Sequence, residues 1–162
     1  MKRKGQIQNV FIYITAMIVI AAVLLLGYGF VKDLLNKGCS AEQQAFQVNL
    51  NKLLNTYNSH GSVNREFLQL PCDFTEICFV DTARIDTPID MLPEYSIIEQ
   101  SVESGVERNI FLIGKTIEPL QYNDKVAVVR DEDYFCEKAR SGRVKIVFTG
   151  KGRTVELDRG VY

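Results

Sequence analysis

Four cysteines carry the chemistry that is easiest to place in this chain of 162 residues, and they are Cys39, Cys72, Cys78 and Cys136. An even number permits two disulfides in an oxidising compartment, and four cysteines allow three connectivities that a sequence leaves open. Because Pro71 favours a turn, we expect Cys72 to meet Cys78 across a tight loop and Cys39 to pair with Cys136. The alternatives are a zinc site, which would need two closer cysteine pairs, and free thiols in a cytosolic domain.

Other reactive residues occur singly. Gly114-Lys115-Thr116 is similar to the end of a phosphate-binding loop, but Asn109 stands where that motif needs its first glycine. His60, the sole histidine, lies in a Ser-His-Gly sequence typical of a solvated turn. Ser40 and Ser141 lie near lysines, which leaves a membrane-bound Ser–Lys peptidase as a third class of function without a defined site. We therefore expect no enzymatic activity and no cofactor.

Acidic residues form two groups that could bind a hard cation. One group is Asp131-Glu132-Asp133, and the other is the series Asp81, Asp86 and Asp90. Neither has the spacing of an EF-hand loop. We expect solvated acidic turns and no metal site.

Charge is unevenly distributed along the chain. The net charge is −1, and the segment Lys2-Arg3-Lys4 holds three of the 19 basic residues. The rest of the chain contains 16 basic and 20 acidic residues, and no acidic residue precedes Asp33. This balance gives no reason to expect nucleic-acid binding, whereas a basic tip is typical of the cytoplasmic end of a membrane protein.

An apolar segment from Val10 to Phe30 follows the basic tip. As a helix it would reach about 31 Å, close to the roughly 30 Å hydrocarbon core of a bilayer. We expect a transmembrane helix in contact with membrane lipid, with the N-terminus inside and the rest of the chain outside. The alternatives are a cleaved signal peptide, for which no A-x-A site follows, and a buried core helix.

The order Lys-Arg-Lys-Gly-Gln before a continuous apolar helix resembles the prepilin signal of archaeal type IV pilin-like proteins, over about the first 30 residues. The resemblance implies that a prepilin-type peptidase cuts between Gly5 and Gln6. The apolar helix would stay on the mature chain, first as an anchor and later as filament core. The chain departs from the pattern at Gln8 and Val10, where archaeal pilins of the Q-x-S-x-E type carry Ser and Glu.

Beyond the apolar segment the pattern predicts one α+β domain. Gly38 is expected to end the first helix, and Ser40 with Gln43 to cap an amphipathic helix over about 41–58, ended by the turn at 58–61. A short helix is expected between Pro93 and Gly105. Six strands of a mainly antiparallel sheet are expected: Phe67–Leu70, Glu76–Val80, Asn109–Ile113, Lys125–Val129, Val144–Thr149 and Arg153–Leu157.

The sequence thus predicts three parts: a basic leader at 1–5, a transmembrane helix and stem at 6–37, and an extracellular disulfide-bonded domain at 38–162. Our first hypothesis is a pilin-like structural or adhesive subunit of the cell surface that assembles with itself or with other pilin-like subunits through its apolar helix. The second is a single-pass membrane-anchored extracellular binding domain that forms no filament.

Overall fold

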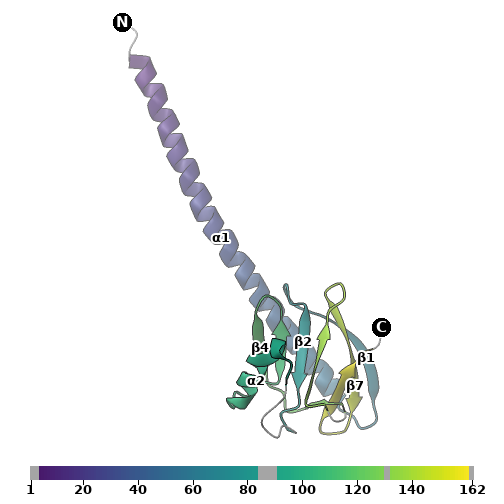
Figure 1. Cartoon of the computed structure of the whole chain (residues 1–162). Coiled ribbons are helices and arrows are strands. Elements are labelled where there is room, and N and C mark those ends of the chain that lie inside the picture. The colour runs from purple at the N-terminus through teal and green to yellow at the C-terminus, as the bar shows by residue number, and fades with distance from the viewer. Residues whose placement is uncertain (1–3, 84–90, 130–131, 161–162) are drawn as a thin grey trace. The chain divides into compact units, whose positions relative to one another are not determined.

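A computed structural model describes residues 4–83, 91–129 and 132–160, including the side chains of these ranges other than 4–11 and 32–37. The chain divides into two compact units, unit 1 (Met1–Ala41) and unit 2 (Glu42–Tyr162) (Figure 1). The first elements along the chain are helix α1 (Lys4–Thr56) and strands β1 (Val63–Gln69) and β2 (Glu76–Val80). A 3-10 turn η1 (Pro93–Tyr95) and helix α2 (Ser96–Glu103) come next. The remaining strands are β3 (Ile110–Ile113), β4 (Ile117–Gln121), β5 (Val126–Val128), β6 (Tyr134–Lys138), β7 (Arg143–Gly150) and β8 (Val155–Arg159).

Helix α1 is continuous through the unit boundary, so the predicted break at Gly38 is wrong. Gly38 and Ser40 both lie inside the helix. An internal glycine costs a helix only about 1 kcal/mol relative to alanine, and no proline occurs from Lys4 to Thr56. The predicted end is confirmed, because α1 stops at Thr56 and a turn follows at 58–61.

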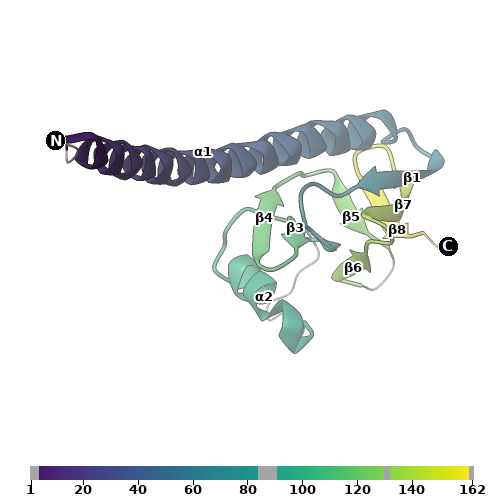
Figure 2. The ribbon, with the colours of Figure 1, turned by 90° about the horizontal axis from the view of Figure 1, so that it is seen from above.

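Unit 2 contains two four-stranded sheets in the orders β1-β7-β8-β5 (sheet A) and β4-β3-β2-β6 (sheet B). All pairings are antiparallel except β5 with β8. The predicted α+β class with mainly antiparallel pairing is confirmed, although the strands form two sheets. Figure 2 shows the strands of unit 2 between the last turns of α1 on one side and α2 on the other.

The core of unit 2 has two layers, one on each face of sheet B. Ile77 and Phe79 of β2 pack with the inner face of sheet A and with α1. Cys78 and Val80 of the same strand face the other way, toward η1 and α2. All five residues of β2 are therefore buried, which is typical of a strand covered on both faces.

The hairpin of β7 and β8 is the most regular part of sheet A. Val144, Ile146 and Phe148 are buried in alternation with more exposed neighbours, as the sequence predicts. Gly150 is the last residue of β7, and the backbone of the turn after α1 passes close to it. A Cβ added at Gly150 would lie 2.0 Å from the carbonyl oxygen of Ser59. Only glycine fits this crossing.

Two strands, β4 and β6, were not predicted, and the predicted helix cap of Ser40 with Gln43 is wrong. β4 contains Pro119, which breaks a strand pattern in sequence but is tolerated here because β4 is an edge strand of sheet B. β6 is short, and only one of its residues, Phe135, is fully buried. Gln43 does not cap a helix, because it lies within α1 and its amide donates to Glu118 Oε2 at 2.9 Å.

Candidate functional site

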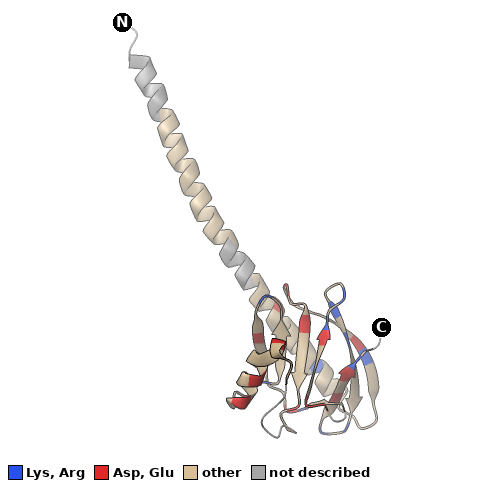
Figure 3. Ribbon diagram, in the orientation of Figure 1, with Lys and Arg blue, Asp and Glu red and all other residues tan. Residues whose placement is uncertain are grey.

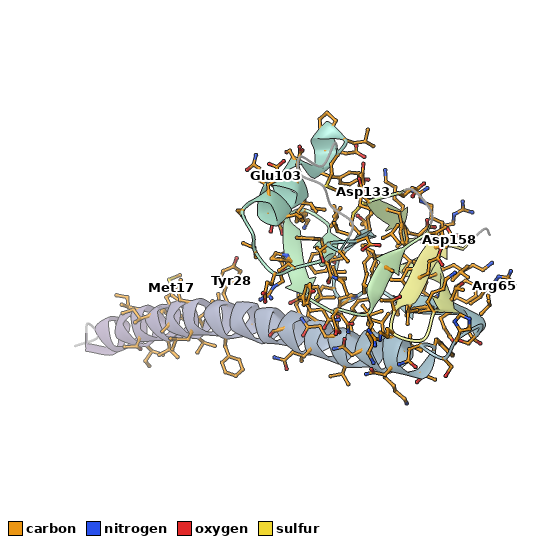
Figure 4. The ribbon with its side chains drawn as sticks, turned by 90° about the horizontal axis from the view of Figure 1, so that it is seen from below. Met17, Tyr28, Arg65, Glu103, Asp133 and Asp158 are labelled. Atoms are coloured by element: carbon orange, nitrogen blue, oxygen red, sulfur yellow. A yellow bond between two sulfur atoms is a disulfide. The ribbon has the colours of Figure 1, made fainter. Side chains whose placement is uncertain are left out.

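The apolar part of α1 presents its side chains outward on every side. From Ile12 to Val31 the large apolar side chains are between 52% and 77% exposed, and this segment is long and apolar enough to cross a bilayer. Met17 and Tyr28, labelled in Figure 4, both point away from the helix axis. A soluble protein rarely exposes so large an apolar surface, and such surfaces contact lipid or other protein chains.

The last four turns of α1 bury one apolar stripe. Phe46, Leu50 and Leu54 recur at four-residue spacing and are at most 6% exposed. They pack with side chains of both sheets, and Tyr57 continues the stripe with its ring 5.8 Å from that of Phe148. The spacing that predicts an amphipathic helix is therefore the spacing by which the last four turns of α1 pack into the core of unit 2.

A neighbouring stripe of α1 carries amide side chains at every fourth residue, namely Gln43, Gln47, Asn51 and Asn55. Each bonds to the segment from β4 to β5. Gln47 donates to the carbonyl oxygen of Leu120 at 2.9 Å, and Asn51 exchanges two hydrogen bonds of 3.0 Å with Gln121. Asn55 accepts a bond from Lys125. The part of α1 that belongs to unit 2 thus packs through one apolar and one polar line of side chains, which fixes the rotation of this part within unit 2.

The cysteines are connected differently from the prediction. Cys78 of β2 forms a disulfide with Cys136 of β6, with 4.0 Å between the two Cα atoms. The expected pair of Cys72 with Cys78 is therefore wrong, and so is that of Cys39 with Cys136. Strand register places Cys136 directly opposite Cys78. That register cannot be predicted from the sequence pattern, because the pattern does not predict β6. Cys39 and Cys72 are also disulfide-bonded, so none of the four cysteines is free.

Cys72 lies in the turn after β1. Its backbone has a φ of 52°, and its N–H donates to Glu42 Oε2 at 2.8 Å. The predicted turn at Pro71 is confirmed by a hydrogen bond from the N–H of Phe74 to the carbonyl oxygen of Pro71. A groove of about 460 Å³ lies beside this turn, lined by Phe46, Asn49, Gln69 and others along α1 and β1.

A second cleft, of about 380 Å³, lies beside Cys136 and includes Tyr95, Tyr134 and Arg159 in its lining. The Tyr95 hydroxyl donates to Glu76 Oε1 at 2.8 Å, and both residues are buried. Burial, followed by the hydrogen bond to Glu76, raises the pKa of Tyr95 well above its usual value. Burial likewise raises the pKa of Glu137 on β6. The described lining of the two clefts contains no Ser, Thr, His or Lys side chain.

The other reactive residues are dispersed. Lys115 and His60 are exposed in turns, and Ser141 lies in the turn before β7 with a φ of 52°. Ser40 is an exposed residue of α1. None of these four residues lines either cleft.

Only part of each acidic group lies within the described residues. Asp81 is buried, and its carboxylate accepts bonds from the backbone N–H groups of Ala83 and Val128. Glu132 pairs with Arg159 at 3.4 Å. Asp86, Asp90 and Asp131 lie outside the described residues. Among the residues that are described, no three His, Cys, Asp or Glu side chains are placed to hold a metal ion.

Gly5 and Gln6, the expected processing position, fall in the first turn of α1, whereas Lys2 and Arg3 lie outside the described residues. The chain matches no protein family, no curated protein and no solved structure.

Proposed function

We propose that the chain is a pilin-like subunit of the cell surface, with a structural or adhesive function and no cofactor. Its apolar helix is held first by membrane lipid and later by the same helix of other subunits. A prepilin-type peptidase removes residues 1–5 before this assembly. The disulfide-bonded unit 2 forms the exposed layer.

The observation that carries the proposal is the contrast within α1. The segment Ile12–Val31 is apolar and exposed, while Phe46, Leu50 and Leu54 of the same helix are buried in unit 2. The 20-residue span matches a bilayer core in length, and because it lies inside the longer helix α1, its backbone amides are bonded within the helix, as lipid requires. Such a segment serves equally as an anchor in lipid and as a packing surface for a second copy.

The disulfide-bonded cysteines and the basic residues at the N-terminus support the proposed location of each part of the chain. Four disulfide-bonded cysteines support an oxidising, extracellular location for unit 2. The basic residues of 2–4 support a cytoplasmic N-terminus. Both arguments favour a single pass with unit 2 outside.

One observation favours the second candidate, a membrane-anchored binding domain that keeps its leader and forms no filament. Val10 stands where many pilins carry an acidic residue, and no acidic residue precedes Asp33. In this case the clefts of unit 2 would supply the binding surfaces.

N-terminal sequencing and intact mass of the protein isolated from its native cells separate the two candidates. A chain that starts at Gln6 and is recovered in sheared surface material supports the pilin-like subunit. A chain that keeps residues 1–5 and remains in the membrane fraction contradicts it and leaves the anchored domain.

A further inference from the structure

Sheet A has an outer face that no described element covers along β1 and β7. It carries a group of side chains, called here the basic face: Val63, Arg65, Phe67, Arg143 and Lys145. Val63 and Phe67 are 58% and 57% exposed, although both are large apolar residues. Lys145 Nζ lies 5.8 Å from the centre of the Phe67 ring, so cation and aromatic ring form one surface. The acidic residues of this sheet face, Glu156 and Asp158, lie on β8 beyond β7.

The helix α2 and its flanks form a surface of opposite charge. The residues of this acidic face are Leu92, Glu94, Ile97, Glu103 and Val106. All are exposed, and Leu92 and Ile97 are 56% and 59% exposed although their neighbours Tyr95 and Ile98 are buried. The segment from Leu92 to Glu107 contains no basic residue. Two basic residues lie near it: Arg108, which follows this segment, and Arg159, which lines one cleft together with Leu92. In Figure 3 the ribbon of α2 accordingly carries red segments and no blue ones.

The two faces match in chemistry and lie on opposite sides of unit 2. Each combines exposed apolar side chains with charges, basic on one face and acidic on the other. Sheet A, the main core, sheet B and α2 follow one another as layers, and Figure 4 shows Arg65 and Glu103 at opposite sides of this unit. A face of one copy therefore complements a different face of the next copy, and repetition of such a contact forms either a ring or an open chain of subunits.

We infer that the basic face of one copy of this chain docks on the acidic face of a second copy, in a head-to-tail contact between successive units 2. The inference rests on the proposed function, to which it adds the contact between exposed domains. The contact is held by opposite charges around apolar centres, so it fixes which side of each subunit meets the next.

The test uses full chains in phosphatidylcholine vesicles, labelled with donor or acceptor fluorophores, and measures energy transfer between copies. One variant carries Arg65→Glu with Arg143→Glu, and the other carries Glu94→Lys with Glu103→Lys. Each variant alone should associate at least about tenfold more weakly than the native chain, because like charges then meet. A mixture of the two variants should regain the lost association, because each pair of faces is again complementary.

Arg153→Glu and Asp124→Lys are matched controls, since both residues are exposed outside the two faces. They should leave association unchanged, whereas high salt should weaken association of the native chain. If energy transfer between copies is the same for both face variants as for the native chain, the head-to-tail contact is overturned. The proposed assembly through the apolar helix is not affected by that result. Transfer that is lost in both variants and in their mixture would also overturn the head-to-tail contact.

Discussion

The segments Ile12–Val31 and Phe46–Leu54 belong to one helix but present their apolar residues in opposite ways. In the first, apolar side chains surround the helix and are exposed. In the second, they form one stripe beside a stripe of amides, and both stripes are occupied by unit 2. The pattern around the helix, not helix propensity, therefore decides which part needs lipid or other subunits and which part needs its own domain.

Charges placed in the first segment should have the largest effect. Ile20→Asp with Leu24→Asp should remove the chain from the membrane fraction, because an aspartate at the centre of a membrane helix costs about 2.5–3.5 kcal/mol. The matched control is Val48→Asp, since Val48 belongs to the docked part of α1 but is 69% exposed. The measurement is the fraction of protein retained in membranes after an alkaline wash. Full retention of the double variant would contradict the proposed membrane anchor.

Shortening a side chain in the docked segment should destabilise unit 2 itself. Leu50 is completely buried, so Leu50→Ala should lower the free energy of unfolding by about 2–5 kcal/mol. Leu24→Ala is the matched control and should leave that free energy unchanged. Urea unfolding of the full chain in detergent, followed by circular dichroism, measures both. Equal urea midpoints of unfolding for Leu50→Ala and Leu24→Ala would contradict the claim that only the docked segment stabilises unit 2.

The disulfide of sheet B should stabilise unit 2 without affecting the apolar segment. Replacing Cys78 and Cys136 together by alanine should cost about 2–4 kcal/mol of unfolding free energy, because the bridge restricts the unfolded chain, and membrane retention should stay native. Peptide mapping without reduction should recover Cys78 linked to Cys136. A peptide that links Cys78 to Cys72 would refute the register of β2 with β6.

Tyr95 should give unit 2 a smaller, pH-dependent contribution. Its pKa is raised by burial and by the bond to Glu76, so the fold favours the neutral phenol. That contribution is complete below the unfolded pKa of about 10 and is lost as the pH rises toward the folded value. Tyr95→Phe should cost about 1 kcal/mol at neutral pH and reduce the loss of stability above pH 10. An unchanged alkaline slope in unfolding experiments would contradict this role.

Structure could be predicted from the sequence where the pattern within a single helix or strand is sufficient. The apolar stripe of α1 and the alternation in β7 are local patterns, and both were predicted correctly. The failures concern partners that are distant in sequence. The disulfide of Cys78 depends on the register with β6, and the amides of Gln43 and Gln47 donate to acceptors more than 70 residues later. Neighbouring residues indicate neither pairing, because only the folded arrangement of the sheets brings these partners together.

A cysteine scan along the apolar segment tests the proposed assembly most directly. All four native cysteines are disulfide-bonded, so a single cysteine introduced between residues 20 and 26 supplies the one free thiol for cross-linking in living cells. The pilin-like subunit predicts cross-linked copies in material sheared from the cell surface, with a yield that rises and falls at helical spacing. Chains that stay in the membrane fraction without cross-links at any of these positions would contradict assembly through the apolar helix.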